Sequence, residues 1–177
     1  MENQEIWTVG HSTHPIDKFL SILKSFGIEA LVDVRSLPGS QKFPQFDKEA
    51  LEISMPENHI EYIHLLGLGG RRKTSKQSRN TAWRLTSFRG YADYMETGAF
   101  MDAVQALEAI GKSKRTAYMC AEAVWWSCHR SLISDYLKFH GWAVHHIMGT
   151  GKAQEHPYTR AAKIKDHRLD YSNDEPA

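Results

Sequence analysis

The stretch Thr116–His140 reads TAYMCAEAVWWSCHRSLISDYLKFH and contains the two elements from which α/β folds are built. Residues 116–119 form an apolar run that is typical of a buried strand, and residues 131–140 follow a helical pattern. Between them lie both cysteines of the chain, a carboxylate, an imidazole and a guanidinium. Strand ends and helix N-termini direct polar groups into a crevice. The stretch therefore predicts an α/β fold with its chemistry at this junction.

Other short apolar runs lie along the chain at intervals that leave room for helices. They predict strands at 6–9, 30–34, 60–65 and 143–147, and helices at 15–26, 47–55, 90–95 and 100–110. Because strands alternate with helices, we expect a three-layer α/β single domain with a mainly parallel sheet of about five strands flanked by helices. This α/β domain spans 1–149. Residues 150–177 are polar and lack a clear period, which predicts an extended or frayed tail.

The composition is that of an ordinary globular domain. A net charge of +1 in 177 residues gives no overall attraction to nucleic acid or to a membrane, so charge has to be considered locally. No apolar run approaches the roughly 20 residues that span a bilayer, and residues 1–5 are acidic and polar, unlike a secretory signal. Two cysteines are too few for a disulfide framework. We expect a cytoplasmic protein with reduced thiols and no membrane partner.

Polar motifs follow each of the predicted strands. The carboxyl ends of parallel strands meet at one edge of a sheet, so we expect these motifs to line a common crevice. In chain order they are Gly10-His11-Ser12, Asp33-Val34-Arg35, His64 with Gly67–Gly70, Cys120-Ala121-Glu122 and His145-His146.

The same motifs resemble the domain-of-unknown-function family 488. Its pattern is carried here by Thr8–Ser12, Leu31–Arg35, Pro38 with Ser40, Pro44 with Phe46, Leu66–Gly70, Tyr91–Met95, Cys120–Glu122 and Cys128–Arg130. The family has no established activity, so the resemblance implies no reaction. Members often carry Ser-Arg before the Pro-x-Phe element. Here Gln41 follows Ser40, so a cationic role at that position would pass to Lys42 or be lost.

Cys120 is the candidate nucleophile. A thiol at a strand end is activated by a nearby cation or by helix N-terminal dipoles, and His129 and Arg130 are the candidate activators. Glu122, His129 or His11 would handle protons. The alternative is that Cys120 is a small buried apolar residue. Together with Cys128, Glu122 and His129 it also offers zinc-ligand types, but their spacing matches no finger pattern, and no metal site is predicted.

Asp33 and Arg35 alternate with Val34 and therefore share one face if the strand continues. They form either a structural ion pair or a base with an anion clamp. His11 has a similar ambiguity, because a histidine after a strand acts as a base or caps the next helix. Ser12 and Ser40 are candidate substrate-binding hydroxyls on the same loops.

The segment 62–92 contains no acidic residue. Gly69 and Gly70 permit close backbone approach to a ligand. Of Trp125 and Trp126, one is expected to pack into the core while the other walls the crevice, and Trp125 is the substrate-binding candidate. Basic side chains with interspersed aromatics suit a phosphate-bearing or single-stranded partner, although a solvated loop is the alternative. The basic residues are Arg71, Arg72, Lys73, Lys76, Arg79, Arg84 and Arg89.

These observations lead to two functional hypotheses. The first is a cysteine-dependent enzyme that acts on a nucleotide, a nucleic acid or another anionic substrate, with Arg35, Arg130 and the Arg71-Arg72 pair holding the anion. The second is a nucleic-acid-binding or stress-linked module whose Cys-His-Arg cluster is structural or metal-binding. The sequence indicates no particular cofactor and leaves the oligomeric state open.

Overall fold

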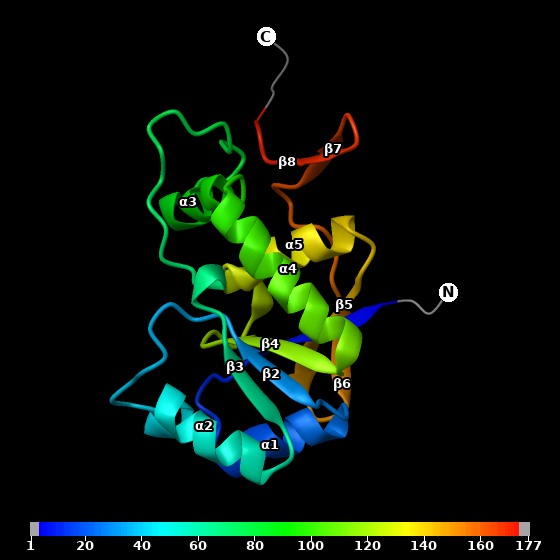
Figure 1. Ribbon diagram of the computed structural model, residues 1–177. Coiled ribbons are helices and arrows are strands. Elements are labelled where there is room, and N and C mark those ends of the chain that lie inside the picture. The colour runs from blue at the N-terminus through cyan, green and yellow to red at the C-terminus, as the bar shows by residue number, and fades with distance from the viewer. Residues whose placement is uncertain (1–3, 174–177) are drawn as a thin grey trace.

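The computed structural model describes residues 4–173, and its centre is a six-stranded sheet (Figure 1). The strand order is β3-β2-β4-β1-β5-β6, and all neighbours are parallel except β5 and β6. The predicted mainly parallel sheet is confirmed. The expectations for residues 1–3 and 174–177 lie outside the described residues. The strands are β1 (Glu5–Gly10), β2 (Ala30–Asp33), β3 (Glu61–His64), β4 (Thr116–Cys120), β5 (Ala143–Gly149) and β6 (Lys152–Glu155).

Helices cover both faces of the sheet and complete the three layers (Figure 1). On one face lie α1 (Ile16–Ser25) and α2 (Lys48–Glu57), whose apolar side chains pack with Trp7 and Met119. On the other face lie α3 (Thr86–Tyr94), α4 (Gly98–Ser113) and α5 (Arg130–Phe139), which pack with Val32 and Tyr118. Short 3₁₀ turns are η1 (Pro44–Phe46), η2 (Leu66–Leu68) and η3 (Trp125–Ser127). Among residues 4–173, no helix is long and apolar enough to cross a membrane.

Side-chain alternation along the strands decides which chemistry reaches which face. In β4, Tyr118 and Cys120 belong to the core under α3, α4 and α5, whereas Ala117 and Met119 belong to the core under α1 and α2. In β2, Val32 lies under α3–α5, so its neighbour Asp33 faces the α1–α2 side. Residues one position apart at the same edge of the sheet therefore serve opposite faces.

The C-terminal segment is more ordered than its polar sequence predicts. The expectation of an extended or frayed tail is wrong for Lys152–Asp170, where β6 extends the sheet and β7 (Lys163–Lys165) pairs with β8 (Arg168–Asp170). Its strands are largely exposed, which is why no apolar period marks them. Two buried polar side chains, His156 and Tyr171, attach the segment to the domain.

Candidate functional site

The polar motifs at the sheet edge separate into two groups. His11 and Arg35 line a cavity that contains neither Cys120 nor Arg130. Cys120 packs in the core under α3–α5, whereas His11 stacks on Phe46 in the core under α1 and α2. The prediction of one common crevice is therefore wrong, because alternation sends neighbouring strand-end residues to opposite faces.

The two cysteine thiols lie against each other on the α3–α5 side. Cys120 ends β4, Cys128 directly follows η3, and their Sγ atoms are 2.8 Å apart. Both are free and buried, with exposed fractions of 3% and 7%. Gly10 makes room for the chain between them, since a Cβ there would lie 1.7 Å from the main-chain oxygen of Glu122. That oxygen is 3.7 Å from Cys120 Sγ.

Arg130 lies beside the thiol pair and is 1% exposed. Its Nη1 donates to Thr8 Oγ1 at 3.2 Å and its Nη2 to the main-chain oxygen of Glu122 at 3.1 Å, while Nε has no partner. Its backbone N–H donates to Cys128 Sγ at 3.2 Å. Within residues 4–173, no carboxylate forms an ion pair with this guanidinium. A buried cation requires compensation, and a cysteine thiolate is the group at hand.

The two thiols differ in acidity. Burial opposes ionisation of Cys120, but the hydrogen bond from Cys128 and the positive charge of Arg130 outweigh it and lower the pKa of Cys120 to about 7. Burial, together with the hydrogen bond to Cys120, raises the pKa of Cys128 well above its ordinary value. The pair therefore shares one negative charge near neutral pH, and Cys128 retains its proton.

A buried hydrogen-bond chain continues from Arg130 to a carboxylate. Thr8 Oγ1 lies 2.6 Å from His146 Nδ1, His146 Nε2 lies 2.7 Å from His156 Nδ1, and His156 Nε2 lies 2.8 Å from Asp135 Oδ1. With both rings neutral, every donor in this chain has an acceptor in the direction of Asp135. Burial lowers the pKa of His146 to about 2, which keeps that ring neutral.

The sequence predicts no role for Thr8, Asp135 or His156. It marks His146 only as a strand-end histidine. In β5, the His146 side chain points toward the buried hydrogen-bond network. The Trp125 ring stacks on the His146 ring, with the two centroids 4.5 Å apart. Trp125 is thus buried against the network instead of walling a crevice. No local pattern marks a carboxylate and a histidine that meet only after the C-terminal segment has folded back.

Cys128 and His129 form part of the wall of a cleft of about 460 Å³. Trp126, with 54% of its surface exposed, lies on the wall of the same cleft. His129 Nε2 donates to Val34 O at 2.7 Å, and burial lowers the pKa of His129 to about 4, so the ring is neutral at pH 7. The remaining lining residues are Gly70, Leu85, Ser87, Phe88 and Ser127.

Gly70 explains how the glycine pair reaches the cleft. A Cβ on Gly70 would lie 2.5 Å from His129 Nδ1, so only glycine permits this close approach. Gly69 packs in the same way on Ser36, whose hydroxyl accepts the backbone N–H of Arg71 at 3.0 Å. We call residues 71–89 the basic segment. The glycines thus position the start of this segment at the cleft.

On the α1–α2 side, Arg35 lines a cavity of about 390 Å³. Its Nε donates to Asp33 Oδ1 at 2.9 Å and its Nη2 to Asp33 Oδ2 at 2.7 Å and to Phe46 O at 2.6 Å. Its Nη1 lies 3.3 Å from His11 Nε2. Four of the five guanidinium N–H groups are therefore used, and one remains for a ligand. Ser12, Ser40 and Glu122 are also on the wall of this cavity.

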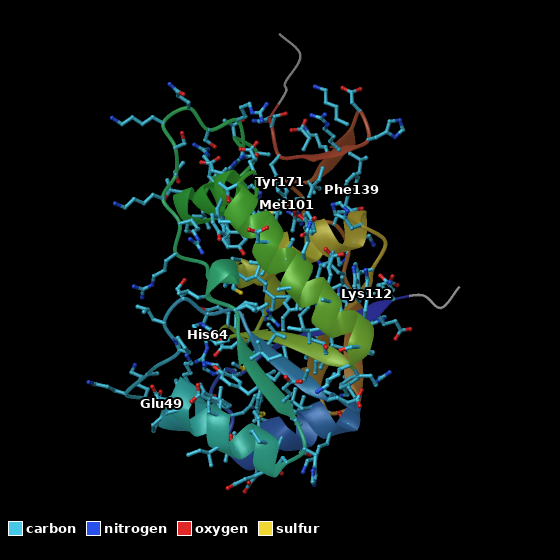
Figure 2. The ribbon with its side chains drawn as sticks, viewed as in Figure 1. Glu49, His64, Met101, Lys112, Phe139 and Tyr171 are labelled. Carbon is cyan, nitrogen blue, oxygen red and sulfur yellow. The ribbon has the colours of Figure 1, made fainter. Side chains whose placement is uncertain are left out.

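Asp33 and His11 position Arg35 in this arrangement. Asp33 is fully buried and also accepts the backbone N–H of Arg35 and the hydroxyl of Tyr62. His11 Nδ1 donates to Ser12 O at 2.8 Å, and burial, with a contribution from the charge of Arg35, lowers the pKa of His11 to about 4. A neutral ring with both nitrogens engaged has no lone pair left for a substrate proton. His64, the last residue of β3, donates from Nε2 to Arg35 O at a distance of 2.7 Å (Figure 2).

The basic segment is partly occupied by contacts within the chain. The Arg72 guanidinium lies 3.6 Å from the centroid of the Tyr94 ring, Arg79 pairs with Glu96 at 2.8 Å, and Arg89 Nε donates to Trp83 O at 3.0 Å. Trp83 is half-buried and packs on Phe88 and Tyr171. Four exposed cations remain: Arg71, Lys73, Lys76 and Arg84.

Glu122 lies between the thiol pair and the Arg35 cavity. Its main-chain oxygen contacts Cys120 and Arg130, and the residue also lines the Arg35 cavity. Across residues 4–173, no group of three or more histidine, cysteine and acidic residues is arranged to hold a metal ion.

These features define a class of protein: a three-layer α/β domain with a buried thiol pair and arginine at the carboxyl ends of its strands. The family model described as "Domain of unknown function DUF488" matches residues 15–137, and the chain belongs to this family. No match was found among curated proteins or among solved structures.

Proposed function

We propose that this protein is a cysteine-dependent enzyme that acts on a nucleotide, with Cys120 as the nucleophile. The observation that carries the proposal is Arg130, a fully buried guanidinium without a carboxylate partner beside two thiols. The cation stabilises a thiolate on Cys120, and the thiolate is the reactive form of cysteine. In the resting state Cys128 donates its S–H to Cys120.

The substrate enters the cleft that Cys128 borders. Trp126 and Phe88 offer aromatic surfaces for a flat ring, and such stacking contributes about 1–3 kcal/mol for each base. Arg71 and Arg84, both exposed, adjoin the lining residues Gly70 and Leu85 and supply charge for a phosphate group. Rotation of the Cys128 side chain uncovers Cys120 to the bound substrate.

The other candidate residues have supporting roles in this proposal. His129 is neutral and holds the segment after β2 through Val34, so it positions the wall of the cleft. Arg35, with one remaining N–H, forms a second anion site with the hydroxyls of Ser12 and Ser40. Its place on the other face of the sheet makes it a site for a separate anionic group.

The test is the ionisation of the thiols in the folded protein. Thiolate absorbance in the ultraviolet should titrate near pH 7 in the wild type and in Cys128→Ser, and the low-pH step should disappear in Cys120→Ser. Alkylation of Cys120 by iodoacetamide should be slowed by a nucleotide but not by free ribose. A wild-type protein in which both thiols titrate at or above the ordinary value of about 8.5 would overturn the proposal.

A second candidate function is nucleic-acid binding by the basic segment. The exposed cations Arg71, Lys73, Lys76 and Arg84 favour it, since none of these side chains is paired with a carboxylate among the described residues. This function requires no thiol chemistry, so the two candidates are separated by the salt titration given in the Discussion.

A further inference from the structure

We propose that Cys120 and Cys128 form a reversible intramolecular disulfide, made by hydrogen peroxide and undone by a small dithiol. This redox chemistry goes beyond the proposed function and needs no nucleotide. The two residues are the only cysteines in the chain, so each has one intramolecular partner.

The geometry of the pair favours the bond. The two Sγ atoms are 2.8 Å apart, and a disulfide is about 2.05 Å long, so the sulfur atoms have to approach by less than about 1 Å. They belong to different elements, the end of β4 and the turn before α5, and yet both point into the core under α3–α5. Nothing separates them at this distance.

The reaction proceeds in two balanced steps. The Cys120 thiolate attacks one oxygen of hydrogen peroxide, the O–O bond breaks, and hydroxide leaves and takes up a proton to become water, which gives a sulfenic acid. The Cys128 sulfur then attacks the sulfenic sulfur, and the hydroxyl group leaves with the Cys128 proton as a second water. A dithiol reduces the disulfide by two exchange steps and is itself oxidised.

The surroundings select a small oxidant. Both thiols are more than nine-tenths buried, so hydrogen peroxide can reach them where a bulky disulfide cannot. Arg130 contributes a positive charge and one N–H, at Nε, that has no partner within the described chain. Such a donor stabilises the negative charge that develops on oxygen when the O–O bond breaks.

The same arginine makes the bond easy to reduce. Oxidation removes the thiolate and leaves Arg130 buried beside a neutral disulfide, with Asp135 reachable only through Thr8, His146 and His156. Loss of the counter-charge disfavours the oxidised form, and a stabilised reduced form is the property of strongly oxidising disulfides. The disulfide also occupies Cys120, so it would switch off the nucleophile of the proposed function.

The test uses the full chain, reduced and then treated with about one equivalent of hydrogen peroxide. Trypsin cleaves after Arg115 and Arg130, so one peptide, residues 116–130, contains both cysteines. We expect this peptide to lose about 2 Da and to resist N-ethylmaleimide, and we expect dithiothreitol to restore two reactive thiols. Cys128→Ser should instead gain oxygen at Cys120 without the loss of 2 Da.

Other products would overturn the inference: oxygen addition at Cys120 with Cys128 still alkylated, a dimer linked between chains, or no reaction at either sulfur. Because Met119 lies in the same peptide, fragmentation has to assign any added oxygen to sulfur of Cys120 or of Met119. A wild type that forms the disulfide while its thiolate reacts with no nucleotide would refute only the proposed function. A titrating thiolate that never forms the disulfide would refute only this inference.

Discussion

Arg130 acts on the surroundings of the thiols in three ways. It supplies a positive charge, its backbone N–H donates to Cys128 Sγ, and its guanidinium donates to Thr8 Oγ1 and to the main-chain oxygen of Glu122. Only the first of these depends on the side chain being cationic. The effect of the charge on Cys120 is therefore separable from the structural role by a variant that keeps the charge and one that removes it.

We expect Arg130→Met to raise the pKa of Cys120 above about 7, because burial of the thiol is then opposed by the hydrogen bond from Cys128 without the positive charge of Arg130. Arg130→Lys retains the charge and should shift the pKa by less. The measurement is thiolate absorbance against pH, with circular dichroism to establish folding. An unchanged pKa in folded Arg130→Met would show that Arg130 does not activate the thiol.

At the scale of elements, apolar runs predicted all five parallel strands, and capping and helical patterns predicted the helices to within a few residues. The same patterns did not predict the division of the site between two faces. Asp33 and Cys120 both end strands, but their faces depend on the register of β2 and β4 against each other. A shift of one residue would exchange the faces, and no single strand's sequence contains that information.

The segment between η2 and α3 shows a second limit. The sequence places basic residues there without an acidic residue among them, whereas folding directs Arg72 onto Tyr94 and Arg79 onto Glu96. Those partners lie in and after α3, and Asp93 in the same helix accepts from Ser75 and Ser78. Acidic residues outside the segment thus neutralise part of it, which a count of charges within the segment cannot reveal.

If the segment binds nucleic acid, the exposed cations should determine the salt dependence. Each neutralised phosphate contributes about 0.7 to 0.9 to the slope of log affinity against log salt. Replacing Arg71, Lys73, Lys76 and Arg84 by glutamine should flatten that slope by up to roughly 3 to 4 units, if all four side chains contact phosphate. The measurement is fluorescence anisotropy with a labelled single-stranded oligonucleotide across a salt series.

The matched control removes the same number of charges elsewhere, by replacing the exposed Lys18, Lys24, Lys152 and Lys163 with glutamine. This variant should keep the wild-type slope. Equal slopes for all three proteins would locate any binding outside the basic segment, and a wild type without salt-dependent binding would exclude this function.

At the scale of the whole molecule, the C-terminal segment closes the network that begins at the thiols. Asp135 in α5 accepts hydrogen bonds from His156, from the backbone and hydroxyl of Thr159, and from Tyr171. Tyr171 lies on the α3–α5 side of the sheet (Figure 2). The acceptors and donors that meet at Asp135 favour one arrangement, because an unpaired member of a buried network is costly. Residues far apart in the sequence are therefore joined in one buried hydrogen-bond network.

The burial of three histidines predicts acid sensitivity. The pKa of His11 and of His129 is about 4 and that of His146 about 2, all below the ordinary 6.5, chiefly because of burial. In the unfolded chain these rings gain protons below pH 6.5, whereas in the folded protein they stay neutral until about pH 4. Unfolding therefore takes up protons in this window, and the free energy of unfolding falls as the pH is lowered from about 6.5 toward 4.

Between about pH 7.5 and 5, each histidine should remove on the order of 2 kcal/mol from the free energy of unfolding. Denaturant unfolding followed by Trp fluorescence at both pH values measures the loss. His129→Gln keeps a donor for Val34 O but cannot titrate, so the loss should shrink by about one histidine's share. His140→Gln, at an exposed position, should leave the loss unchanged. If His129→Gln shows the full wild-type loss, the ring is solvated in the folded protein, and its assignment as a neutral wall of the cleft is wrong.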